Sequence, residues 1–214
     1  MKDYGGYESR ETRRRNEELS RGVTREVFSP GKQEMREAEE NVSELADLMG
    51  AVEQDAAFWQ GPEQCADSAL ACQEAVARSL LAGEFSPDLL ERCARICEAA
   101  GSKNTGTLLE KMGLEVTQET GCGIRDICQV LSEGGKVIVQ VNGVALRFSE
   151  YARRPGVQAD HTVQVIGVDA EDPRQVKIIF NDPGSSDGRA RSLPQQRFEK
   201  AWEVGDCAMT SVYR

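Results

Sequence analysis

Cys65, His161 and Asp182 are the residues of this sequence whose types and surroundings could carry out acyl chemistry. A thiol nucleophile needs a base that accepts its proton and a third group that orients the base. Cys65 falls at the predicted start of a helix, where unpaired backbone amides favour the thiolate. His161, the one histidine of the chain, opens a predicted strand, and Asp182 follows the next one. The sequence therefore predicts a Cys-His-Asp site assembled from one helix and two strands.

Each of these residues also has an ordinary structural explanation. A Cys in an Ala-rich helix is usually a packing residue, and a single His at a strand edge is commonly a surface residue. An Asp before Pro is a common turn residue, because its side chain bonds nearby backbone amides. Agreement between their order, their spacing and the predicted elements favours a catalytic site over three separate structural roles.

The elements that must position these residues change in type halfway along the chain. Ala- and Leu-rich runs with Gly ends or a Ser-Pro start predict helices at 64–83, 86–101, 105–113 and 124–135. Short Val- and Ile-rich runs between turn residues predict strands at 136–143, 161–170, 175–184 and 207–213, with a short helix at 197–205. Helices followed by an antiparallel sheet form an α+β order. We therefore predict an α+β fold with a helical lobe to about residue 133 and an antiparallel sheet after it.

The first 54 residues differ in composition from the rest. They are dense in Arg and Glu and nearly free of aromatic residues after Tyr7, so they can bury little apolar surface. Apolar residues at helical spacing predict an amphipathic helix within 32–54. We predict a charged, partly helical or flexible extension at 1–54 and one domain at 55–214. Whether the extension directs export, blocks a cleft or packs as a helix is left open.

The composition limits the kinds of partner. Hydrophobic residues make up 39% and charged residues 29%, as in a folded globular domain. The net charge of -10 argues against a general affinity for nucleic acid, which requires clustered Lys and Arg. No apolar run reaches the roughly 18 residues of a membrane span, and the first residues lack the apolar stretch of a signal peptide. We expect a protein of the cytoplasm, or one exported without a cleavable signal peptide, and leave its oligomeric state open.

The seven cysteines do not form a pattern typical of a metal site. Cys93 and Cys97 are one helical turn apart, and Cys65 and Cys72 two turns apart, but the chain has no CxxC pair and a single His. We therefore expect neither a metal nor another cofactor. Cys72, Cys93, Cys97 and Cys128 fall on the apolar faces of predicted helices, which predicts buried, reduced thiols.

Three stretches together carry a family resemblance: Gln60 to Ala66 at a helix start, Asp160 to Asp169, and Ile179 to Gly184. They resemble the corresponding stretches of papain-like cysteine peptidases, and most closely those of the bacterial double-glycine, bacteriocin-processing group. The likeness covers about residues 58–212. It implies a papain-like fold with a helical lobe that bears the Cys and a sheet lobe that bears the His.

The resemblance implies that Cys65 is the nucleophile, His161 the base, Asp182 the orienting residue and Gln60 the oxyanion donor. The spacing of Gln60 to the Cys is one residue shorter than is usual in the family. Its rivals as oxyanion donor are Gln64 and Gln54, and the rival of the orienting Asp is Asn181. Ala66 stands where the best known members have Gly. Trp59 and Trp202 are candidates for the walls of a cleft, although two Trp residues in a core of this size need no functional explanation.

The predicted activity is thiol hydrolysis of a peptide or isopeptide bond in a peptide or protein substrate, as in a bacterial secreted or effector-type protease. Two alternatives stay open. The same residues could transfer the acyl group to another amine or thiol. A papain-like module could also bind a peptide tail without cleaving it.

Overall fold

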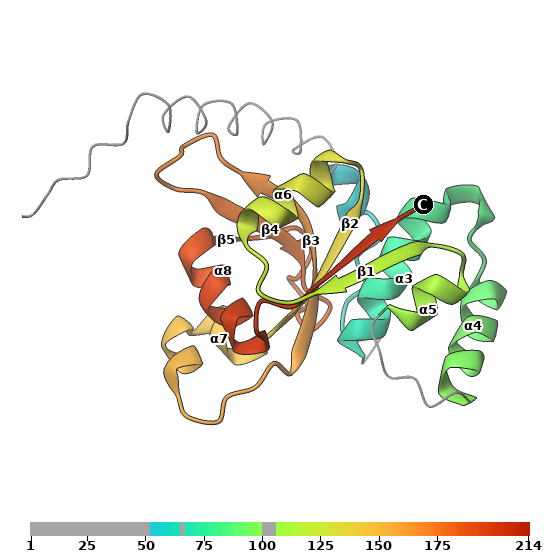
Figure 1. Ribbon diagram of the computed structural model, residues 1–214, viewed down its shortest axis with the longest axis horizontal. Coiled ribbons are helices and arrows are strands. Elements are labelled where there is room, and N and C mark those ends of the chain that lie inside the picture. The colour runs from blue at the N-terminus through green and yellow to red at the C-terminus, as the bar shows by residue number, and fades with distance from the viewer. Residues whose placement is uncertain (1–51, 65–66, 100–105) are drawn as a thin grey trace, which may run out of the picture. The chain divides into compact units, whose positions relative to one another are not determined.

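An antiparallel sheet of six strands lies at the centre of the part of the chain that the computed structural model describes, residues 52–64, 67–99 and 106–214. Figure 1 shows this sheet between two groups of helices. The strand order is β1-β6-β2-β3-β4-β5, and each neighbouring pair is antiparallel. The strands are β1 (Glu115–Glu119), β2 (Lys136–Val141), β3 (His161–Asp169), β4 (Lys177–Asn181), β5 (Arg191–Pro194) and β6 (Met209–Tyr213).

Alternating side chains on the central strands explain why helices cover both faces of the sheet. Val137, Val139 and Val141 of β2 point into one core, whereas Ile138 points into another. The first core is closed by α6 (Ile124–Ser132), α7 (Gly143–Arg147) and α8 (Gln195–Trp202). The second is closed by α3 (Ser68–Leu81), α4 (Pro87–Ala99) and α5 (Thr107–Lys111), which lie on the other side of the sheet in Figure 1.

The mixed helical and antiparallel architecture agrees with the predicted α+β class, but the predicted extent of the helical lobe is wrong. The first half of the chain is not purely helical up to residue 133, because β1 lies between α5 and α6. This strand pairs with β6, the last strand of the chain, so the edge of the sheet joins both halves. Its sequence, Glu-Val-Thr-Gln-Glu, is mostly exposed and has no apolar run, so periodicity did not reveal it.

Helix α3 begins later than the sequence predicted. The side chain of Asp67 accepts hydrogen bonds from the amides of Ala69 and Leu70, at 2.9 and 3.1 Å, and so caps the helix at Ser68. Asp is a much better N-cap than Cys or Gln, so the prediction that Cys65 starts the helix is wrong. Cys65 precedes the cap residue by two positions in the sequence and lies outside the described residues.

Most of the predicted extension, residues 1–51, also lies outside the described residues. Residues 52–56 are helical, and the predicted boundary at 54/55 falls within them. The helix predicted within 32–54 is described only at its last residues. None of the helices in the described ranges is long and apolar enough to cross a membrane.

Candidate active site

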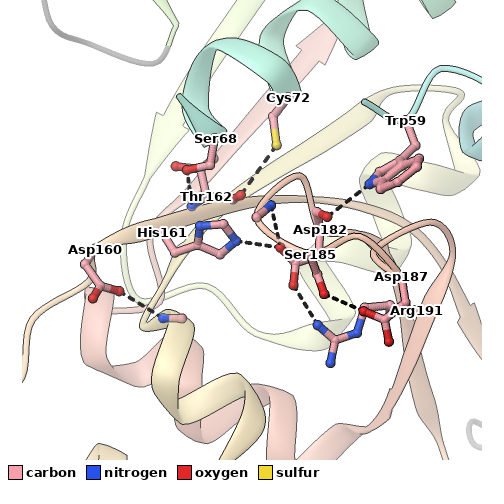
Figure 2. A network of polar contacts seen from close by, with 12 residues as sticks. Trp59, Ser68, Cys72, Asp160, His161, Thr162, Asp182, Ser185, Asp187 and Arg191 are labelled. Carbon is pink, nitrogen blue, oxygen red and sulfur yellow. Dashed lines mark hydrogen bonds and ion pairs between the residues drawn. The ribbon is translucent and has the colours of Figure 1, made fainter. Parts of the chain in front are cut away.

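His161 and Asp182 meet where two paired strands begin and end. His161 is the first residue of β3, and Asp182 directly follows β4, the antiparallel partner of β3. Their side chains are in contact, with 2.7 Å between His161 Nε2 and Asp182 Oδ1 (Figure 2). The histidine side chain is 16% exposed and the aspartate side chain 5%. A carboxylate in this place fixes both the orientation and the tautomer of the imidazole.

The loop after Asp182 folds back on that residue through two glycines. The amide of Gly184 donates to Asp182 Oδ1 at 3.0 Å, and the amide of Asp182 donates to the carbonyl of Gly188 at 2.8 Å. A Cβ atom at Gly188 would lie 1.8 Å from the Asp182 carbonyl oxygen, and one at Gly184 would lie 2.7 Å from His161 Cε1. Only glycine permits these two approaches.

The Asp182 carboxylate also forms an ion pair with an arginine. Arg191, the first residue of β5, contacts Asp182 Oδ2 through its NH1 group at 2.7 Å. Burial would raise the pKa of Asp182, but the hydrogen bond and charge of His161, the Gly184 amide and the Arg191 charge together hold that pKa below its usual range. The carboxyl group is therefore ionised at neutral pH.

Asn181, the rival orienting residue, uses its side chain elsewhere. Its Nδ2 donates to the backbone carbonyl of Asp55 at 3.0 Å, and its Oδ1 accepts from the amide of Ala190 at 3.1 Å. Successive residues of an extended chain point in opposite directions. The structure therefore brings Asp182, and not Asn181, to His161.

Hydrogen bonds of Trp59 and Asp55 attach the segment before α3 to the rest of the fold. The indole Nε1 of Trp59 donates to the backbone carbonyl of Asp182 at 3.0 Å (Figure 2). Asp55 is buried, and its two carboxylate oxygens accept from Ser79 and from Lys136, each at 2.8 Å. These bonds fix the chain that leads to the predicted nucleophile.

Trp202 does not wall a cleft, contrary to the sequence prediction. Its side chain is buried in the core beneath the sheet, packs against Phe198, and donates from Nε1 to the carbonyl of Ala208 at 2.8 Å. A large aromatic residue at helical spacing from another one is well suited to such a core position.

The first turn of α3 contacts β3 next to His161. The amide of Thr162 donates to Ser68 Oγ at 3.1 Å, and Cys72 Sγ donates to the carbonyl of Thr162 at 3.6 Å. In Figure 2 the second ring nitrogen of His161, Nδ1, is turned away from Asp182 and toward the side of α3. The predicted contact between His161 Nδ1 and the Cys65 thiol involves a residue that lies outside the described residues.

Two of the three candidate oxyanion donors line one hollow. It has a volume of about 480 Å³ and is lined by residues 57–60, Gln64, Glu74 and Arg78. Gln60 and Gln64 both belong to it, and Gln54 does not. The side-chain oxygen of Gln64 accepts a hydrogen bond from the amide of Gly61 at 3.0 Å.

A second hollow has a volume of about 540 Å³. Its lining residues are Pro62, Arg147, 184–187 and Arg191. Because Gly184 lies against the imidazole of His161, this hollow borders the His161–Asp182 pair.

The described cysteines differ in burial. Cys72 and Cys93 are buried, as predicted, but Cys128 is only partly buried, and the side chain of Cys97 is outside the description. Burial raises the pKa of the Cys128 thiol to about 11. Burial, followed by nearby acidic residues, also raises the thiol pKa of Cys122 and of Cys207. Within the described residues, no group of three or more His, Cys, Asp or Glu side chains could hold a metal ion.

Sequence reasoning missed Arg191, Gly184 and Ser68 as parts of this site. Arg191 and Ser68 are brought to it by strand pairing and helix packing, which have no local signal in the sequence. The Pro-Gly after Asp182 was visible as a turn, but its closeness to the imidazole was not.

Comparisons with known proteins found few similarities. No family model matches the chain, and no curated protein matches it. Among solved structures, the chain is similar to a protein from Bacillus anthracis that is provisionally assigned as a C39-like peptidase. The identity is 19% and the TM-score 0.39, over 50% of this chain and 56% of that one. The matched part is thus little more than half of that protein, and a likeness this distant carries no argument about activity.

Proposed function

We propose that this protein is a papain-like cysteine hydrolase that cleaves a peptide or isopeptide bond through an acyl-enzyme on Cys65. The observation that carries the proposal is the 2.7 Å contact between His161 Nε2 and Asp182 Oδ1. With Nε2 engaged, Nδ1 is the ring nitrogen left to accept the proton of a nucleophile. The residues concerned all lie within 55–214, which we propose as the catalytic domain.

Covalent geometry supports Cys65 as the partner of His161. Ser68 Oγ is 3.1 Å from the amide of Thr162, the neighbour of His161. Cys65 precedes Ser68 by three residues, and three residues span at most about 11 Å. A thiol on such a short tether is within reach of a base at the start of β3.

The chemistry that we propose follows from these positions. His161 Nδ1 accepts the Cys65 proton, and the thiolate forms a bond to the carbonyl carbon of the substrate. The imidazolium then gives its proton to the leaving amine as the carbon–nitrogen bond breaks, which leaves a thioester. Water, deprotonated by His161, attacks the thioester and releases the acid product and the thiol. Asp182 keeps the imidazole oriented and stabilises its protonated form.

Gln60 is proposed to donate a hydrogen bond to the oxygen that becomes negative in the transition state. A donor of this kind contributes about 3 kcal/mol to lowering the barrier. Gln60 lines the hollow beside the residues before Cys65, which supports its role, and Gln64 lines it too. Comparing Gln60→Ala with Gln64→Ala separates the two, because loss of the donor lowers turnover by about 100-fold or more.

Thiol labelling tests the proposed site without knowledge of the substrate. Iodoacetamide at neutral pH should label Cys65 much faster than the other cysteines, as measured by peptide mass spectrometry. The raised thiol pKa values of Cys122, Cys128 and Cys207 keep the background low. Replacing His161 with Ala should slow the labelling of Cys65, whereas Cys65→Ala should abolish that product. Equal labelling of Cys65 and Cys122, or no effect of His161→Ala, would refute the proposal.

A second measurement separates hydrolysis from the alternatives. A peptide library incubated with the protein should release new amino termini with water as acceptor, and an added amine should not be incorporated. Incorporation of the amine would instead indicate an acyl transferase. Tight peptide binding without product would indicate a binding module.

A further inference from the structure

We propose that Arg191 is a positioning residue of the candidate active site, which fixes the Asp182 carboxylate and offsets part of its charge beside His161. This inference rests on the proposed function. Arg191 touches neither the substrate bond nor the nucleophile in this scheme, and it acts through Asp182.

The contacts of Asp182 divide cleanly between its two oxygens. Oδ1 faces His161 Nε2 and also accepts from the Gly184 amide, whereas Oδ2 faces the Arg191 guanidinium at 2.7 Å. A carboxylate held at only one oxygen can turn about its last bond. One held at both cannot turn without breaking a charge-assisted hydrogen bond.

The guanidinium is itself held in place by the sheet. Arg191 pairs with Phe180 across β4 and β5, and its guanidinium carbon lies 5.8 Å from the centre of the Phe180 ring. Phe180 is buried in the core, and the Arg191 side chain is 20% exposed. Cross-strand pairing with Phe180, two positions before Asp182, thus brings a partly buried cation to the carboxylate.

This arrangement has an electrostatic consequence for the base. An unpaired carboxylate beside an imidazole strongly favours the protonated ring. A cation on the far oxygen offsets part of the carboxylate charge that faces the ring. Asp182 with Arg191 therefore acts partly like a neutral hydrogen-bond acceptor.

The single histidine of the chain makes this measurable. Its imidazole carries two carbon-bound protons, and both resonances can be assigned to His161 by NMR in the full chain because no other histidine is present. Arg191→Gln keeps a polar donor but removes the charge, and the imidazole resonances recorded at one neutral pH should shift and broaden, because the carboxylate that orients the ring loses its charge-assisted hydrogen bond. Labelling of Cys65 by iodoacetamide at neutral pH should also slow several-fold, because the ring loses its fixed orientation.

Two matched variants control for charge and for general damage. Arg191→Lys keeps the charge, so the imidazole resonances should stay near their positions in the parent protein. Arg189→Gln removes an exposed arginine two positions away and should change neither readout. Circular dichroism and melting temperature establish that each variant is folded. If Arg191→Gln does not fold, Arg191→Lys still tests positioning through a slower labelling rate.

A double-mutant cycle isolates the path through Asp182. In an Asp182→Asn background the carboxylate that Arg191 holds is absent, so adding Arg191→Gln should slow the labelling of Cys65 no further. Additive effects of the two substitutions on the labelling rate would overturn the inference.

Failure of the inference and failure of the proposed function look different. If the labelling of Cys65 in the parent protein is rapid and depends on His161, but Arg191→Gln changes neither the imidazole resonances nor the labelling rate, the inference is wrong and the proposed function stands. If the labelling of Cys65 is neither selective nor dependent on His161, the proposed function and the inference fall together.

Discussion

Gly184 and His161 lie so close together that a methyl group on Gly184 would come within 2.7 Å of the imidazole Cε1 atom and 3.2 Å of Nε2. The ring nitrogen concerned is the one that faces Asp182. The absence of a side chain at Gly184 therefore keeps both the ring and its contact with the carboxylate in place.

Gly184→Ala should displace the imidazole, because the ring is a rigid group that cannot yield by rotating a flexible end. We expect labelling of Cys65 at neutral pH to fall at least about tenfold, since small misplacements of catalytic groups are costly. Gly83→Ala is the matched control, because an added Cβ there meets no atom within 4 Å. Equal labelling rates in the two variants would contradict the proposed importance of this contact.

Stability in acid should reflect the lowered pKa of Asp182. A carboxyl group whose pKa is lower in the folded than in the unfolded chain adds stability that is complete above the unfolded value, about 4, and is lost as pH falls through the folded value. The parent protein should therefore be more stable than Asp182→Asn at pH 6, and this advantage should shrink below pH 4. Urea unfolding at a series of pH values measures the difference, with the exposed Glu171→Gln as control. A constant difference down to pH 2 would argue against the linkage.

Lys136→Met should destabilise the fold strongly. Lys136 and Asp55 form an ion pair at 2.8 Å with side chains that are 12% and 1% exposed. Removing one partner of such a pair leaves a buried charge and costs about 3 kcal/mol or more. Lys177→Met breaks the pair with Asp169, in which the lysine is 45% exposed, and should cost less than about 1 kcal/mol. Chemical denaturation of both variants checks the contrast, and similar losses would show that the Asp55 anchor contributes little.

The Cys128 thiol should be unreactive at neutral pH. Burial raises its pKa to about 11, so very little thiolate is present at pH 7. Iodoacetamide labelling of Cys128 in the folded protein should be much slower than in urea, where the pKa returns to about 8.5. The rate in the folded protein should increase as pH rises toward 11. Rapid labelling at pH 7 without denaturant would show that α6 opens readily or that the thiol is not shielded.

Local patterns account for most of the elements and for part of the candidate site. Val- and Ile-rich runs predicted β2, β3, β4 and β6, since alternating apolar residues must face the cores of a sheet. The Ser86–Pro87 cap predicted the start of α4, where Ser86 Oγ accepts from the amide of Leu89. The exposed strand β1 carries no such pattern, and the sequence did not predict it. Helix α3 begins at Ser68, later than predicted, because Asp67 caps it.

By itself, the sequence determined the strand that His161 opens and the turn in which Asp182 lies, because these depend on residues close together in the chain. The tertiary structure decided which of the neighbours Asn181 and Asp182 faces the imidazole, since strand pairing sets the direction of each side chain. It also brought Arg191 to the carboxylate. Contacts between distant residues depend on how strands pair and helices pack, and one short stretch of sequence does not contain that information.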